Sequence, residues 1–82
     1  MSEDDIIAAL RQLAGEEPVA IANKLNHLTD GGLTQFTLVS YFKRAFPEIP
    51  LRTLIEAGAW QRVSDGGVSD EEFNTLLRQW VG

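Results

Sequence analysis

The sequence predicts an all-α domain spanning residues 1–82, with five helices arranged as an N-terminal helix followed by two helix–loop–helix repeats. The main observation is an internal repeat, because residues 28–34 (LTDGGLT) return 35 positions later as residues 63–69 (VSDGGVS). Both copies are flanked by apolar residues at the 3.6-residue period of an α-helix. A repeat of this kind indicates that one supersecondary unit is used twice.

The N-terminal helix is expected over residues 3–14, within a first segment formed by residues 1–16. Ser2 is a favourable N-cap, acidic residues occupy the first turn at the positive end of the helix dipole, and Gly15 is suited to end the helix. Its apolar face consists of Ile6, Ile7, Leu10, Leu13 and Ala14.

The first helix–loop–helix unit covers residues 17–46. Its first helix is expected over residues 18–28, because Pro18 fits the first position of a helix, and its second helix begins after Thr34. Residues 34–42 are rich in β-branched and aromatic side chains, which also permits a strand. The helical period persists to Phe46, however, so a helix is the preferred prediction.

The second unit covers residues 52–81 and follows a break at Pro47 and Pro50. Its first helix is expected over residues 51–61. The inward side chains of that helix are Leu54, Ile55, Ala57 and Trp60. The second helix starts at a capping box, in which Ser69 and Glu72 satisfy each other's backbone N–H groups. Its buried face consists of Phe73, Leu76, Leu77 and Trp80.

Composition and charge restrict the class of protein. The chain has 82 residues, enough for one core, and it contains no cysteine, which excludes disulfides and thiolate metal sites. Twelve acidic and seven basic residues give a net charge of −5, which argues against nucleic-acid binding, because that binding depends on Lys and Arg at phosphates. The acidic N-terminus and the lack of a long apolar run predict a cytoplasmic protein without a membrane segment.

Residues 65–77 (DGGVSDEEFNTLL) resemble the second half of an EF-hand loop and its exiting helix. The EF-hand family pairs two helix–loop–helix units, each with a 12-residue loop that has glycine at position 6 and glutamate at position 12. The resemblance aligns Gly66 and Glu72 with these positions in the second unit, and Gly31 and Thr37 in the first. It implies that the two units pack as an EF-hand-like pair.

The resemblance also implies a short antiparallel bridge between Leu33 and Val68. Loop positions 1, 3 and 5 are Asn26, Leu28 and Asp30 in the first unit, and Gln61, Val63 and Asp65 in the second. Calcium affinity depends on the number and geometry of carboxylate ligands, and most are missing here. We therefore expect neither loop to bind calcium, and we expect no other metal or cofactor.

The sequence shows no catalytic constellation. His27 is the only histidine and has no serine or aspartate partners in a triad pattern, so an enzyme is not expected. Trp60 and Trp80 end apolar stripes and are expected to anchor the core, although Trp80 lies close to the C-terminus. The candidate contacts for a protein partner are aromatic or acidic: Tyr41, Phe46, Trp80, Asp70 and Glu71.

The leading hypothesis is a non-catalytic interaction or regulatory module that binds a partner protein through an apolar helix groove, without calcium. The N-terminal helix is a candidate cover for that groove in the free protein. One alternative is a helix-turn-helix DNA-binding regulator that uses residues 18–46. Its candidate DNA contacts are Gln35, Thr37, Ser40, Lys43 and Arg44. Another alternative is a small acidic inhibitor, of the immunity-protein type, for a basic partner.

Overall fold

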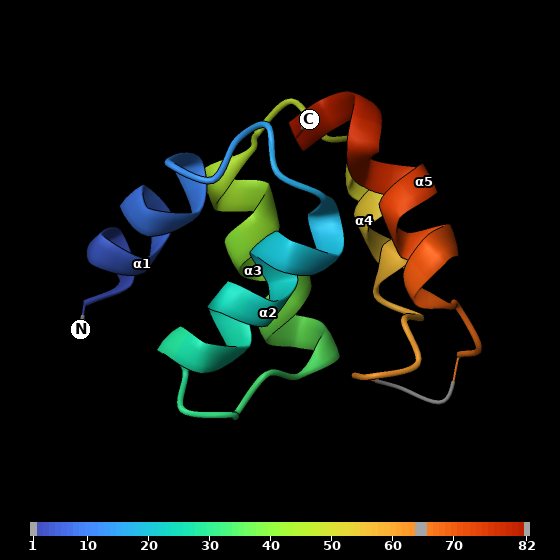
Figure 1. Ribbon diagram of the computed structural model, residues 1–82, viewed down its shortest axis with the longest axis horizontal. Helices are drawn as coiled ribbons and strands as arrows, with labels where there is room; N and C mark the ends of the chain where they lie inside the picture. The colour runs from blue at the N-terminus through green and yellow to red at the C-terminus, as the bar shows by residue number, and fades with distance from the viewer. Residues whose placement is uncertain (1, 64–65, 82) are drawn as a thin grey trace.

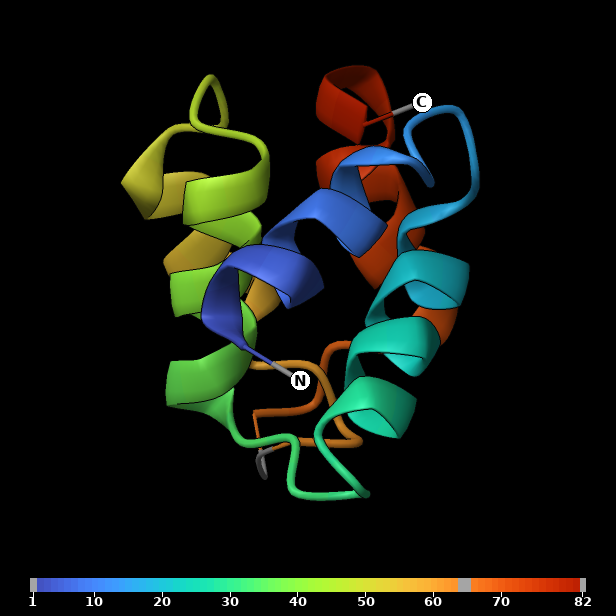
Figure 2. The same ribbon diagram turned by 90° about the vertical axis from the view of Figure 1, so that its left-hand side faces the viewer.

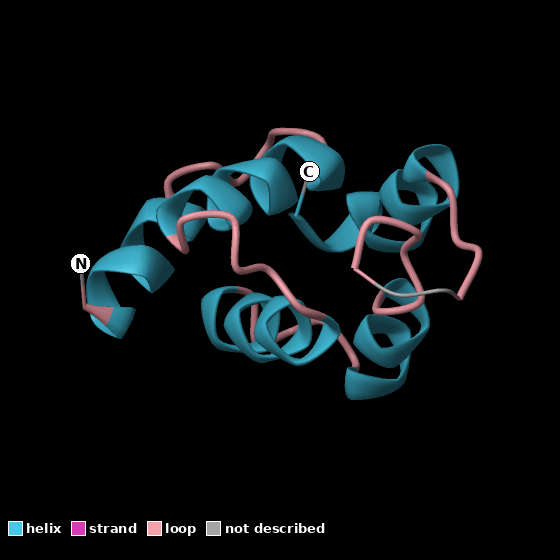
Figure 3. Cartoon of the chain, turned by 90° about the horizontal axis from the view of Figure 1, so that it is seen from below, coloured by secondary structure: helices cyan, strands magenta, loops and turns pink. Residues whose placement is uncertain are grey.

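The computed structural model describes residues 2–63 and 66–81, and this part of the chain is built from helices and loops without a β-strand (Figures 1 and 3). The helices are α1 (Glu3–Arg11), α2 (Pro18–Leu28), α3 (Gln35–Ala45), α4 (Leu51–Ala57) and α5 (Asp70–Val81). The predicted all-α class and the order of five helices are therefore confirmed for the described residues. None of these helices is both long enough and apolar enough to cross a bilayer.

Helix α1 begins where the sequence predicts but ends three residues earlier, at Arg11 instead of Ala14. Ser2 caps it, because the Asp5 N–H donates to the Ser2 hydroxyl at 3.3 Å and the Ser2 N–H donates to the Asp5 carboxylate at 3.4 Å. After Arg11 the chain tightens into turns. Gly15 then takes a left-handed φ of 99° and donates its N–H to the Val81 carbonyl at 2.6 Å. This bond to the end of α5 replaces a further helical turn.

The helices of the first unit agree closely with the prediction. Helix α2 has Pro18 at its first position and ends at Leu28. Helix α3 starts directly after Thr34, whose hydroxyl accepts the Thr37 N–H at 3.1 Å. The strand alternative for residues 34–42 is wrong, because the cap and the helical apolar stripe both favour α3.

Helix α4 ends at Ala57, four residues before the predicted end at position 61. Gly58 follows it as the C-cap, and the chain then runs beside residue 68 as a parallel bridge between Trp60 and Val68. The Gln61 N–H donates to the Val68 carbonyl at 2.8 Å, and the Val68 N–H donates to the Ala59 carbonyl at 3.0 Å. These bonds to Val68 take the place of the helical hydrogen bonds that residues 59–61 would otherwise form, and they end α4.

The core is centred on aromatic side chains from both units. Trp60 stacks on Phe73 with ring centroids 4.5 Å apart, and Phe73 meets Phe42 edge-on at 6.2 Å. Phe42 in turn meets Phe46 edge-on at 5.9 Å. Around this cluster, α2 packs against α5, α3 packs against α4, and α4 packs against α5. Apolar burial of this kind is the main favourable contribution to folding.

The predicted inward position of Ile55 is wrong, because this side chain is 56% exposed. Helix α4 rests on the core through Leu54 and Ala57, which are almost fully buried. Gly58 lies close to Gln35 and Val39 of α3 and allows this close approach. A short helix that packs through one narrow face leaves its neighbouring face in solvent, and Ile55 lies there.

Helix α1 lies across α2 and α3 (Figure 2) and is part of the core. Leu10 is fully buried, and the Arg11 guanidinium donates to the carbonyls of Ala45 and Arg44 at 3.2 and 3.3 Å. Glu3 forms a salt bridge with Arg44 at 2.9 Å. These contacts fasten α1 to the first unit, so it does not cover the surface of the second.

Replacing Leu10 by alanine should lower the free energy of unfolding by about 3 kcal/mol, because it leaves a cavity under α1. The change is measured by urea denaturation followed by circular dichroism. The matched control is Ile55→Ala on exposed α4, which should change stability by less than about 0.5 kcal/mol. Equal stability of the Leu10 variant and the native chain would show that α1 is not part of the core.

Candidate functional site

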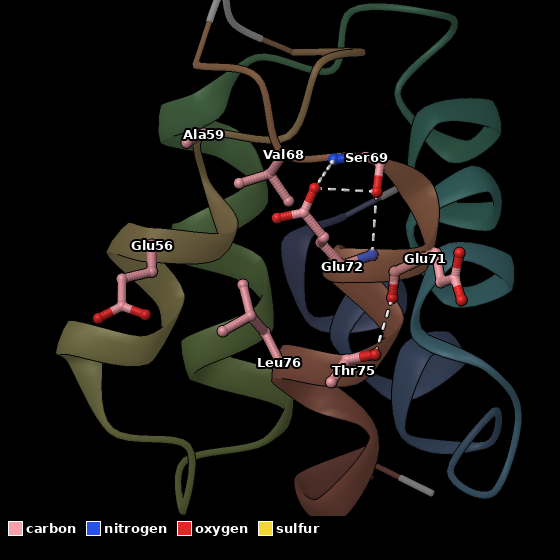
Figure 4. Close-up of a pocket in the computed structure, with 8 residues that line it drawn as sticks. All are labelled: Glu56, Ala59, Val68, Ser69, Glu71, Glu72, Thr75 and Leu76. Carbon is pink, nitrogen blue, oxygen red and sulfur yellow. Dashed lines mark hydrogen bonds between the residues drawn. The ribbon is translucent and has the colours of Figure 1, made fainter.

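The main candidate site is an open groove between α4 and α5, on the surface of the second unit (Figure 4). It encloses about 770 Å³. Its lining comes from the end of α4, the residues before α5 and the outer face of α5: Glu56, Ala59, Val68, Ser69, Glu71, Glu72, Thr75 and Leu76. The groove is therefore formed entirely within the second copy of the repeat.

The floor of the groove is apolar. Val68 and Leu76 extend from the α5 side toward α4, and Ala59 lies opposite Val68 at the end of α4 (Figure 4). Leu76 is only half-buried, because α5 directs Phe73 and Leu77 into the core and leaves Leu76 at the edge of that face. The sequence assigned Leu76 to the buried face, and the structure places it at a surface groove instead.

Helix α4 also carries two exposed apolar side chains outside the groove lining. Leu51 and Ile55 lie one turn apart on this helix, and their side chains are 53% and 56% exposed. Ile55 precedes Glu56 in sequence, but successive residues of an α-helix point about 100° apart, so Ile55 does not share the groove-facing side of Glu56. Exposed apolar residues of this kind are ordinary on protein surfaces.

Three carboxylates belong to the lining of the groove: Glu56, Glu71 and Glu72. Glu72 is held by the predicted capping box, because its N–H donates to the Ser69 hydroxyl at 3.2 Å and its carboxylate accepts from that hydroxyl at 3.2 Å and from the Ser69 N–H at 3.4 Å. Within the described part of the chain, the carboxylates of Glu56 and Glu71 accept no hydrogen bond. They remain available to an external donor.

The two hydroxyl groups that line the groove form hydrogen bonds with the backbone of α5. Ser69 caps α5, and the Thr75 hydroxyl donates to the Glu71 carbonyl one turn earlier at 3.0 Å. Neither hydroxyl has a histidine or lysine beside it among the lining residues, so the groove presents no activated nucleophile. The chemistry that the groove offers is apolar contact together with carboxylate acceptors.

The described glycines of the two Asp-Gly-Gly loops meet different constraints. In the first loop Asp30 and Gly31 take left-handed φ values of 56° and 79°, and the Asn26 carboxamide accepts the Leu33 N–H at 3.3 Å. In the second loop Gly66 lies so close to Ala59 that an added Cβ would be 2.4 Å from its side chain. Glycine is required at position 66 by space, and at positions 31 and 67 by backbone conformation.

The antiparallel bridge expected between Leu33 and Val68 is wrong. Both backbone groups of Val68 are used by residues 59–61, in a parallel bridge within its own unit. The Leu33 N–H is used by Asn26, also within its own unit. Each loop is closed by local partners, which leaves neither free to pair with the other.

The described residues do not assemble calcium ligands. They contain no group of three or more histidine, aspartate or glutamate side chains that is placed to hold a metal ion. Glu72, which the loop alignment puts at position 12, is used in the capping box. Asp65, at position 5 of the second loop, lies outside the described residues.

Only one of the predicted partner contacts lies at the groove, namely Glu71. Asp70 begins the same helix, but its carboxylate accepts from the Trp60 indole N–H and from the Arg62 guanidinium, both at 2.7 Å. It therefore fixes the start of α5 to the core.

The three aromatic candidates lie elsewhere. Phe46 is buried in the aromatic cluster, and Tyr41 is half-buried with the Arg44 guanidinium 6.0 Å from its ring centre. Trp80 is half-buried near the end of α5, and its indole N–H has no hydrogen-bond partner among the described residues. The structure does not bring these rings together with Glu71 into one site.

Sequence reasoning missed Glu56, Val68 and Leu76 as groove residues. No local pattern marks them, because Glu56 is an ordinary exposed acid of a helix and Leu76 has the same helical spacing as the core residues Phe73 and Leu77.

The cations proposed as DNA contacts are used within the chain. The Lys43 ammonium group donates to the carbonyls of Pro47 and Ile49 at 2.9 and 2.7 Å. Arg44 pairs with Glu3, and this hydrogen bond raises the pKa of its guanidinium above the usual value. Both side chains stabilise the end of α3 and its contact with α1.

Comparison of the chain with protein-family models, with curated proteins and with solved structures finds no match.

Replacing Gly66 by alanine should destabilise the fold by about 2 kcal/mol, because the added methyl group would force the loop away from Ala59. Thermal unfolding followed by circular dichroism measures the effect. The control is Gly67→Ala, where nothing lies within 4 Å of an added Cβ but φ is 84°, and which should cost about 1 kcal/mol of backbone strain. A Gly66 variant as stable as the Gly67 variant would contradict the close approach.

Proposed function

We propose that this protein is a non-catalytic interaction module that binds a helix of a partner protein in the groove between α4 and α5, without calcium. The observation that carries the proposal is the open groove between α4 and α5, which has an apolar floor formed by Ala59, Val68 and Leu76. A helix with one apolar stripe buries such a surface while it keeps its polar face in water.

The dimensions of the second unit suit a partner helix of a few turns. Helix α5 has 12 residues, which corresponds to a length of about 18 Å. Leu76 lies on this helix and Val68 directly precedes it, so the apolar floor follows the first half of α5. An amphipathic helix presents the apolar residues of one stripe to a floor of this kind.

We further propose that the two helix–loop–helix units form an EF-hand-like pair whose role is structural. The packing of α2 against α5 and of α3 against α4 supports it, because a pair of duplicated units joins the first helix of one to the second helix of the other. The glycines and caps of the repeat then orient the helices, and the binding function belongs to the helix faces.

The absence of catalysis is supported by the local bonding of the groove. Its hydroxyls cap or brace α5, and one of its three carboxylates is bound to the capping serine. The remaining carboxylates, Glu56 and Glu71, come from different helices and have no nucleophile to activate among the described lining residues.

Leu76→Gln should weaken binding of an amphipathic helix by about tenfold, because it places an amide on the apolar groove floor. The probe is a synthetic helix of about 16 residues with leucines on one face and glutamines on the other. Amide chemical-shift mapping by NMR gives both the site and the affinity, and the shifts should centre on residues 56–59 and 68–76. Circular dichroism verifies that the variant is folded.

The matched control for this experiment is Phe36→Gln on α3, which removes the most exposed apolar side chain, 81% exposed, outside the groove lining. It should leave the affinity unchanged. Shift changes confined to another surface, or no binding at millimolar protein, would refute the proposed function.

Calcium should produce no saturable change in tryptophan fluorescence up to about 1 mM. Trp60 is a suitable reporter, because it stacks on Phe73 and donates to Asp70 at the start of α5, next to the second loop. Saturation at micromolar calcium would show that the protein binds the ion, and it would contradict a calcium-independent module.

A further inference from the structure

The two units of the repeat differ in what covers their outer surface. Helix α1 lies across α2 and α3 in the first unit (Figure 2), whereas the groove between α4 and α5 in the second is open (Figure 4). The 35-residue offset aligns Ile21 with Glu56. Ile21 is fully buried, and Glu56 is exposed. A position that is apolar and covered in one unit is thus charged and open in the other.

Helix α1 shows which kind of helix the first unit accepts. It buries Ile6 and Leu10, and it carries three acidic residues in its first turn. One of them, Glu3, forms the 2.9 Å salt bridge with Arg44. Residues 17–46 contain three basic and two acidic residues. An acidic amphipathic helix is therefore seated on a unit of opposite charge.

The second unit has the reverse charge. Residues 52–81 contain five acidic and three basic residues. Two of those cations are paired away from the groove, since Arg62 binds Asp70 and Arg78 binds Glu17. The third, Arg52, lies one turn before Glu56 and does not line the groove. The groove lining itself contains three carboxylates and no lysine or arginine.

The two unbonded carboxylates come from the two helices that form the groove. Glu56 belongs to α4, and Glu71 belongs to α5, where its side chain projects from the side of the helix away from α4 (Figure 4). A helix lying on the floor formed by Val68 and Leu76 has Glu56 beside one flank of its apolar stripe. On the other flank, a lysine or arginine side chain that extends over α5 would meet Glu71.

We infer that the groove selects a basic amphipathic helix, with lysine or arginine on both flanks of its apolar stripe; this inference rests on the proposed function. A second copy of the chain is a poor occupant, because it carries a net charge of −5 and its own acidic helix α1 is already seated. Opposite charges at a groove increase the rate of association and the discrimination between partners.

The experiment uses three synthetic helices with the same leucine face and with lysine, glutamine or glutamate on both flanks. Their affinities for the full chain are measured by calorimetry at low salt and at about 0.3 M salt. The lysine helix should bind about tenfold more tightly than the glutamine helix at low salt, and the glutamate helix should bind most weakly. The preference should shrink at high salt, since both carboxylates are solvent-exposed.

The double variant Glu56→Gln, Glu71→Gln should abolish the preference for the lysine helix over the glutamine helix. The control is Glu16→Gln, Glu48→Gln, which removes the same net charge from two exposed residues outside the groove lining and should retain the preference.

If the glutamine and lysine helices bind equally in the groove, the inference is overturned and the proposed function stands. If none of the three binds there, the proposed function itself fails. Sedimentation of the native chain provides a separate check. A dimer disrupted by Leu76→Gln would identify a second copy as the occupant and overturn the inference.

Discussion

The stacking of Trp60 on Phe73 is the contact on which the second unit depends. It draws the chain after α4 into the core, with ring centroids 4.5 Å apart and Trp60 only 1% exposed. The same indole donates to Asp70 at 2.7 Å and so positions the start of α5. Because Trp60 points inward, the neighbouring backbone of residues 59–61 is free to pair with Val68. The aromatic contact thereby ends α4, closes the loop and sets one end of the groove.

The position of α1 makes the two units unequal. A duplicated helix–loop–helix would present two similar outer surfaces, but α1 buries one of them and is fastened there by Arg11 and the Glu3–Arg44 pair. Exposed ion pairs contribute little to stability, so burial of Leu10 contributes most of the free energy that holds α1 against α2 and α3. The two units also differ in charge: residues 17–46, which α1 covers, have a net positive charge, and residues 52–81, which contain the open groove, have a net negative charge. Helix α1 therefore covers the outer surface of α2 and α3, whereas the groove between α4 and α5 stays open.

The Asp-Gly-Gly repeat has two different structural roles despite its near-identical sequence. In the first loop the left-handed residues Asp30 and Gly31 reverse the chain, and Asn26 closes the turn through its side chain. In the second loop Gly66 is needed for close approach to Ala59. The difference arises outside the repeat. Val68, directly after the second Asp-Gly-Gly, is bonded to residues 59–61 at the end of α4, where Trp60 is buried.

The sequence by itself determined where the helices begin, because the signals for a helix start are local. The cap at Ser2, Pro18 at the start of α2, the cap at Thr34 and the Ser69–Glu72 capping box each act within four residues, and each appears at the predicted place. Tertiary structure alone decided the end of α4, the seat of α1 and the groove. These depend on which residues far apart in sequence meet, and periodicity does not distinguish a half-buried Leu76 at a groove from a leucine of the core. Among the predicted partner contacts, only Glu71 lines the groove. Its place in the first turn of a helix can be recognised from the sequence, whereas the approach of Glu56 to the same groove depends on how α4 packs against α5.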